Sequence, residues 1–231
     1  MWQFVSRLED SGQDLIMGLS IGVGLVAEYA GSEYDDLAHQ IRGDLEQINQ
    51  TTAKLGLPLH EEPESFDKPL HMRVSLRSFP YSWLHYLRRF AAHVMRDPKW
   101  VPYPIQPGED PAEDPVLRQM YKRMESHLLC HSDSEGYYLP VDVDQLIIDE
   151  DDPLPGMVVG SSLRLKEELL TLVGALEIDV DDRGWLSDAE ADELSKQRPT
   201  SAPFAIERLV WLALYEACRI SIDYQTAIVF E

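Results

Sequence analysis

The chain has 231 residues, of which 44% are apolar and 26% charged, and this composition excludes a wholly disordered chain. Its 41 acidic residues against 20 basic ones give a formal net charge of −21, which argues against nucleic-acid or membrane-surface partners. The length suits one large domain, which we expect over residues 18–231 after an N-terminal extension at 1–17.

Two bulk features predict a cytoplasmic protein. The apolar stretch at residues 15–30 contains a glutamate and follows acidic residues, unlike a secretory signal, and no apolar run is long enough for a membrane span. The two cysteines, Cys130 and Cys218, each lie in an apolar run and are predicted to be reduced core thiols. A single disulfide between these two cysteines is the alternative that the sequence leaves open.

The first half of the chain predicts one strand and two helices. Residues 20–26 form a short apolar run that is typical of a buried strand. Residues 32–55 carry apolar side chains at helical spacing, and Gly56 marks the end of that helix. A second helix opens with Pro80 in its first turn and extends to Arg96. Six prolines between residues 97 and 115 predict a long loop.

The second half predicts shorter elements around one apolar helix. We expect helices at 116–127, 163–176 and 188–197, and strands at 128–130, 137–141 and 226–230. Ser161 or Ser162 is a suitable N-cap for the helix that follows. Residues 204–222 are apolar nearly all round, which predicts a central buried helix. The whole pattern predicts a single α+β domain, with several helices packed around a small, mostly antiparallel sheet.

Charge is distributed unevenly along the chain. Residues 66–100 carry 7 basic and 2 acidic side chains, whereas residues 137–200 carry 16 acidic and 5 basic ones. The helix after Pro80 gathers several of the basic groups on one side, namely His85, Arg88, Arg89, His93 and Arg96. Arginines one turn apart can hold a phosphate or a carboxylate, so this stripe predicts an anion site. It also fits a solvated helix face, or one neutralised by the acidic residues 142–152.

A second group of polar residues follows at 131–138. His131, Asp133 and Tyr137 crowd a tight turn, and together with His85, Arg88 and Arg89 they form the predicted ligand-binding set. Turn chemistry alone also explains this composition. His127 and His131 resemble half of a zinc site, but no second ligand pair has metal spacing, so no metal is favoured there.

Residues 179–190 resemble a calcium-binding EF-hand loop. Asp179, Asp181 and Glu190 stand at ligand positions, and predicted helices flank the loop. Arg183 departs from the pattern, because a cation replaces an oxygen ligand there. The loop is therefore a weak calcium candidate beside a plain capped acidic turn, and no other cofactor is expected.

Catalytic motifs are not supported. Glu216 with Arg219 in the apolar C-terminal helix fits a structural ion pair better than a general base. Ser161 and Ser162 after Gly160 lack the motif of a hydrolase nucleophile, so an enzyme is not favoured.

Several segments together resemble a bacterial protein family without an assigned activity: 79–88, 131–142, 156–162, 207–216 and 227–230. In style, a small acidic α+β protein is also similar to the immunity proteins of toxin systems. Two hypotheses follow. The first is a binding protein, such as an immunity-type inhibitor, whose acidic surface meets a basic protein, with no nucleic acid or membrane involved. The alternative is a protein that binds an anionic small molecule near His85, Arg89 and His131.

Overall fold

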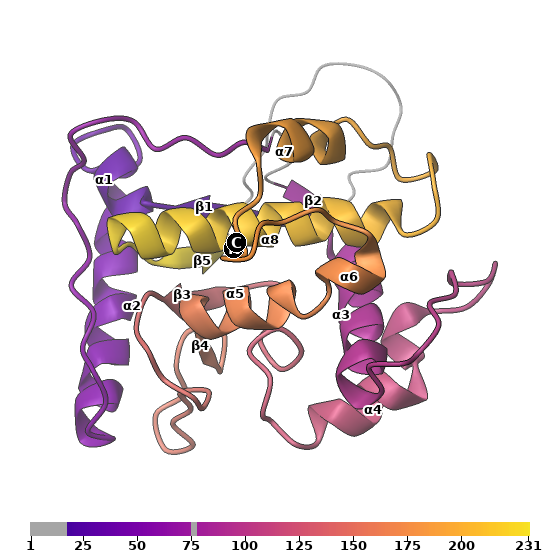
Figure 1. Cartoon of the computed structure of the whole chain (residues 1–231). Coiled ribbons are helices and arrows are strands. Elements are labelled where there is room, and N and C mark those ends of the chain that lie inside the picture. The colour runs from indigo at the N-terminus through magenta and orange to yellow at the C-terminus, as the bar shows by residue number, and fades with distance from the viewer. Residues whose placement is uncertain (1–17, 75–77) are drawn as a thin grey trace.

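A five-stranded sheet runs through the protein in the order β2-β1-β5-β3-β4 (Figure 1). The computed structural model describes residues 18–74 and 78–231, so the predicted N-terminal extension lies outside the described residues. Only β3 and β4 pair in parallel, and the other neighbours are antiparallel, as predicted. The strands are β1 (Gly18–Val23), β2 (Ser78–Pro80), β3 (Gly136–Leu139), β4 (Val159–Ser161) and β5 (Ile228–Phe230).

Helices surround this sheet and confirm the predicted single α+β domain. In Figure 1, α8 crosses the middle of the molecule, with α2 at one end and α3 and α4 at the other. The helical elements are α1 (Leu25–Tyr29), α2 (Asp35–Lys54), α3 (Tyr81–Arg96), the 3-10 turn η1 (Pro111–Glu113), α4 (Pro115–Tyr121), α5 (Ser162–Leu170), α6 (Val173–Leu176), α7 (Asp188–Ser195) and α8 (Ala205–Tyr224).

The sheet separates two apolar cores, because successive side chains of a strand point to opposite faces. On β5, Ile228 and Phe230 join the core around α8, whereas Val229 joins the core beside α2. Burial of α8 is nearly complete, and its Trp211 and Tyr215 are fully covered, which confirms the predicted central helix. Cys130 and Cys218 are both free thiols.

Several expected elements differ in the structure: the strand expected at 20–26 ends at Val23, where α1 soon follows, and the helix expected at 163–176 is divided into α5 and α6. The helix expected at 116–127 ends at Tyr121, and the strand expected at 128–130 is a turn instead. The carboxylate of Glu168 accepts the backbone N–H groups of His127 and Leu128, each at 2.8 Å, so α5 holds this turn in place of a strand partner. Within the described ranges, no helix is both long and apolar enough to cross a membrane.

Candidate functional site

The basic stripe of α3 turns Arg88 and Arg89 inward and leaves Arg96 exposed. Arg88 is buried and donates to the carbonyl oxygens of Leu128 at 2.9 Å, His131 at 2.6 Å and Ser132 at 3.2 Å. A guanidinium is planar and has five N–H donors, so three carbonyl oxygens can accept from it with good geometry. Arg88 therefore ties the turn after Tyr121 to α3 and presents little of its charge to solvent.

Four of the six predicted ligand-binding residues meet at this point. His85 Nε2 lies 3.0 Å from Asp133 Oδ2. The ring of His131 stacks on Tyr138, and its nitrogens face the carbonyl oxygens of Ser132 at 3.0 Å and Tyr137 at 3.1 Å. Burial lowers the pKa of His131 to about 4, and burial followed by the charge of Arg88 lowers the pKa of His85. Arg88 is the fourth member, and the four bond mainly to one another and to nearby carbonyls.

The other two predicted residues lie elsewhere. Arg89 donates to Asp114 Oδ2 at 3.3 Å and to the carbonyl of Tyr103 at 3.2 Å. The Tyr137 hydroxyl donates to Asp44 at 2.6 Å, in the core beside α2. Asp114 thus pairs with Arg89 and His93, Asp133 lies beside His85, and carbonyl oxygens accept the hydrogen bonds of Arg88, so residues 142–152 are not the partners of these side chains. Ligand binding by this set stays a prediction.

The EF-hand-like loop holds its own backbone. Asp181 Oδ1 accepts the N–H groups of Trp185 at 2.8 Å and Arg183 at 2.9 Å, and these bonds hold the pKa of Asp181 below its ordinary value. Glu190 accepts the N–H of Asp179 at 3.4 Å. In the part of the chain that the structure describes, no three His, Cys, Asp or Glu side chains are grouped to hold a metal. Calcium binding here stays a prediction.

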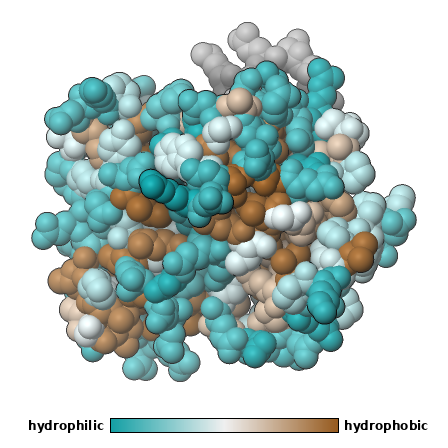
Figure 2. All heavy atoms as spheres, in the orientation of Figure 1, coloured by the Kyte–Doolittle hydropathy of each residue, from teal (hydrophilic) through white to brown (hydrophobic). Residues whose placement is uncertain are grey.

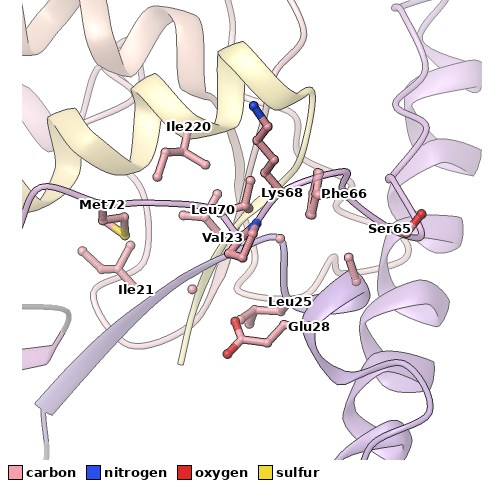
Figure 3. A pocket seen from close by; sticks show the side chains of 14 residues that line it. Ile21, Val23, Leu25, Glu28, Ser65, Phe66, Lys68, Leu70, Met72 and Ile220 are labelled. Carbon is pink, nitrogen blue, oxygen red and sulfur yellow. The ribbon is translucent and has the colours of Figure 1, made fainter.

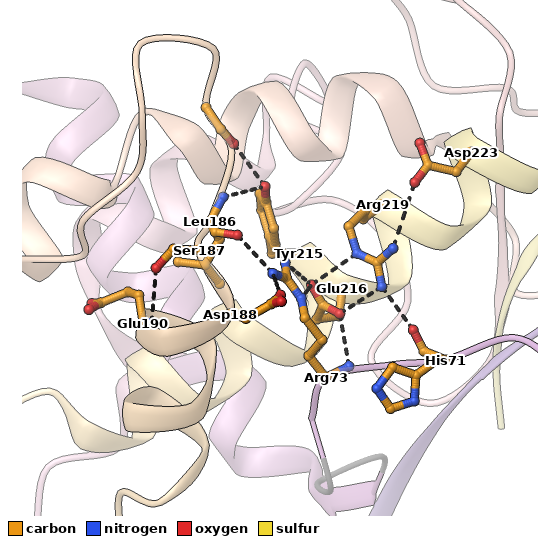
Figure 4. Close-up of polar contacts among 11 residues, drawn as sticks. His71, Arg73, Leu186, Ser187, Asp188, Glu190, Tyr215, Glu216, Arg219 and Asp223 are labelled. Atoms are coloured by element: carbon orange, nitrogen blue, oxygen red, sulfur yellow. Dashed lines mark hydrogen bonds and ion pairs between the residues drawn. The ribbon is translucent and has the colours of Figure 1, made fainter.

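A buried ion cluster lies beneath α7 (Figure 4). Glu216 on α8 is fully covered and lies 2.7 Å from Arg73 and 3.0 Å from Arg219. Burial alone would raise the pKa of Glu216, but hydrogen bonds from Arg219 and Arg73 hold it below its ordinary value. Sequence spacing indicated the pair of Glu216 with Arg219, whereas Arg73 lies in a segment without periodicity and gave no signal.

Arg73 links this cluster to the residues around Asp188 at the surface. Its guanidinium donates to the carbonyl of Leu186 and to Asp188, each at 2.8 Å. The Tyr215 hydroxyl, also on α8, accepts the N–H of Leu186 at 3.1 Å and donates to the carbonyl of Gly184 at 2.8 Å. The side chains of Arg73 and Tyr215 thus fix the chain between Gly184 and Asp188.

Several ion pairs at the surface share an asymmetry, in which the guanidinium is covered and the carboxylate faces solvent, whereas both members are exposed in the pairs Arg118–Glu113 and Arg123–Glu125. The Arg73 side chain is 11% exposed and that of Asp188 is 91% exposed. Arg208 at 11% pairs in the same way with Glu177 at 83%. Arg164 lies among three carboxylates that are each more than half exposed, those of Asp142, Asp144 and Glu167. The outer part of each of these pairs is therefore negative, and the group around Arg164 carries a net negative charge.

We define residues 177–193 as the acidic segment. It holds eight acidic side chains and one basic one. At its centre the indole of Trp185 is 47% exposed, with the Arg73 guanidinium 5.4 Å from its ring centroid. Hydrophobic side chains also interrupt the hydrophilic ones over the face of the protein in Figure 2. The surface thus offers apolar as well as acidic contacts to a partner.

Comparison with protein families gives a match over residues 17–230, to the family described as "Putative DNA-mimic protein". The match covers most of the chain, so the chain belongs to this family. No curated protein and no solved structure matches the chain. The family supports a protein that binds another protein through an acidic surface. We expected a protein partner with no nucleic acid involved. The family overturns this expectation, because a mimic of DNA points to partners that bind DNA.

Proposed function

We propose that this member of the DNA-mimic family binds a DNA-binding protein and occupies the surface that DNA would take. The observation that carries the proposal is the asymmetry of the ion pairs, in which covered guanidiniums support exposed carboxylates. Duplex DNA presents about one negative charge per 1.7 Å of helix axis, so a mimic needs many carboxylates at fixed positions. Arginines that grip phosphate also grip carboxylate with the same two-pronged geometry.

The acidic segment is our candidate for the contact surface. Arg208 binds Glu177 at 3.2 Å near its start, and Arg73 binds Asp188 further along. A segment fixed at several points loses little conformational freedom on binding, which favours affinity. Trp185 adds an exposed aromatic ring among the carboxylates, and tryptophan is enriched among the residues that dominate interface energies.

Capture followed by competition tests the proposal. The immobilised full chain is used to capture proteins from a lysate of its source, and each captured protein is assayed for binding to labelled duplex DNA. We expect a captured protein whose DNA complex is displaced by the chain, with displacement weakening as salt increases. If no captured protein binds DNA, or if DNA and the chain bind together without competing, the proposal is wrong.

Matched triple variants locate the surface. The first triple removes three charges from the acidic segment, as D182N, D188N and E193Q. The second removes three exposed charges elsewhere, as D144N, E150Q and D151N. We expect the first to weaken competition by at least about tenfold and the second by much less, because only charges at the contact are lost from the interface. Equal losses would contradict the placement.

The identity of the captured partner also tests the immunity-type role. That role requires a partner that acts on DNA and harms cells unless this chain is present. Growth of cells that produce the captured protein, with and without the chain, measures this directly. Growth that does not depend on the chain would leave DNA mimicry standing without an immunity role.

A further inference from the structure

A pocket of about 560 Å³ lies between the end of β1, α1, the segment 65–72 and α8 (Figure 3). It shares no residue with the acidic segment or with the predicted ligand-binding set. Its volume lies within the usual range for small-molecule sites, roughly 300–1,000 Å³. Its middle is lined by apolar side chains, among them Ile21, Val23, Leu70, Met72 and Ile220.

A glycine, which has no side chain, shapes one wall of this pocket. Gly24 has a φ of +74°, and a Cβ there would lie 2.5 Å from Leu70 Cδ1 and 2.9 Å from Phe66 Cε2. A larger residue at this position would clash with both side chains as well as strain the backbone. The close approach of the segment 65–72 to the β1–α1 turn, which bounds the pocket, thus depends on glycine.

Two opposite charges line the pocket. Lys68 and Glu28 are both exposed, and within the described residues neither takes part in an ion pair. In Figure 3 they lie on opposite sides of the apolar lining.

We infer that this pocket binds a small zwitterion whose ammonium and carboxylate lie at opposite ends of an apolar body. The ammonium lies toward Glu28, the carboxylate toward Lys68, and the apolar body between them against Leu70 and Met72. Short apolar peptides with free ends and ω-amino acids share this chemistry. The inference goes beyond the proposed function, since it concerns a different part of the surface.

Four probes separate the contributions of the two ends. Isothermal titration of the full chain compares 8-aminooctanoate, octanoate, octylamine and the dipeptide leucyl-leucine. We expect 8-aminooctanoate to bind about fivefold more tightly than either probe with one charge, because each end gains an ion pair worth about 1 kcal/mol at most. Tighter binding of leucyl-leucine than of 8-aminooctanoate identifies the peptide as the source, and the reverse identifies the ω-amino acid. If no probe binds at millimolar concentration, or if a probe with one charge binds as tightly as both zwitterions, the inference is wrong.

Charge variants assign each end. K68Q should weaken 8-aminooctanoate and octanoate about fivefold and leave octylamine unchanged, whereas E28Q should do the reverse for the two single-charge probes. K122Q and E150Q, which remove exposed charges outside the pocket, are the matched controls and should change nothing. Equal binding in K68Q, E28Q and the controls would place the probes elsewhere and overturn the inference.

Discussion

Helix α3 and the acidic segment use the same kinds of ion pair and present opposite faces to solvent. On α3, Arg88 and Arg89 are buried, and their partners are mainly carbonyls and the half-buried Asp114, whereas Arg96 is exposed. The acidic segment is bound by Arg208 and Arg73, which lie outside it and are also covered, whereas its carboxylates Glu177 and Asp188 face solvent. Two of the three arginines of α3 therefore add little positive charge to the surface, whereas the acidic segment keeps these carboxylates exposed.

This difference shows that local charge in a sequence does not give local charge at a surface. What matters is which member of each pair the fold covers. Guanidiniums suit covered positions because five donors can be satisfied by carbonyls and carboxylates together. Covering the arginines leaves the acidic excess on the outside, which is the arrangement that a DNA mimic needs.

The largest expected effect breaks the anchor of the acidic segment. E216Q removes the charge that Arg73 and Arg219 share in a fully buried position. We expect the free energy of unfolding to fall by about 3–5 kcal/mol, because two covered cations lose the buried counter-charge that they share and keep only the more exposed carboxylates of Asp188 and Asp223. Urea denaturation measures the change. E46Q, at an exposed position on α2, is the control and should change stability by less than about 0.5 kcal/mol. A similar small change in E216Q would show that the cluster does not anchor the segment.

The pH dependence of stability tests the turn beneath α3. His131 has an ordinary pKa of 6.5 and a pKa of about 4 when folded, lowered first by burial. Between these values the unfolded chain binds a proton that the folded protein does not, so stability is lost as pH falls from about 6.5 to about 4. The loss amounts to about 3 kcal/mol at most.

Comparison with H131Q isolates this contribution from those of the other titrating groups. The variant is expected to lose less stability than the natural chain over the same pH range in urea denaturation. H39Q, whose histidine side chain is 67% exposed, should keep the full pH dependence. If H131Q and the natural chain lose equal stability, His131 does not titrate in this way.

Much of the fold follows from local patterns, and the failures have a common cause. The first and last residues of α3 and α8 lie close to the predicted ones, because helical periodicity and Pro80 are local signals. The apolar residues 128–130 predict a strand, but the chain forms a turn there. The carboxylate of Glu168, about forty residues away, accepts the N–H groups of this turn. The helix expected at 163–176 is likewise divided into α5 and α6.

The polar sites are predicted less well because they depend on distant partners. His85, Arg88, His131 and Asp133 lie together, whereas Arg89 and Tyr137 of the same predicted set lie elsewhere, and none of these contacts could be predicted from spacing. Arg73 lies 143 residues before Glu216, and nothing in its own segment indicates that contact. The acidic excess of residues 137–200 could be recognised from the sequence, since counting carboxylates requires no knowledge of their partners.

A smaller effect is expected where a buried arginine is held mainly by carbonyl oxygens. R88M retains the apolar stem but removes the donors to Leu128, His131 and Ser132. We expect a loss of about 2–3 kcal/mol in the free energy of unfolding, because covered carbonyls lose charged donors. R96M on the same helix is the control, since Arg96 is exposed, and it should differ little from the natural chain. Equal stability of R88M and R96M would contradict the structural role of Arg88.

The smallest expected effect is the most informative for the acidic segment. Asp188 contacts Arg73 at 2.8 Å, yet its side chain is 91% exposed, so water and salt screen the pair. We expect D188N to change the free energy of unfolding by less than about 0.5 kcal/mol in urea denaturation, against several kcal/mol for E216Q. The two carboxylates bind the same guanidinium, so the contrast isolates burial as the cause. A loss above about 1 kcal/mol in D188N would mean that the outer carboxylate stabilises the fold. A small loss instead leaves that charge free to serve recognition, where its removal should weaken competition with DNA.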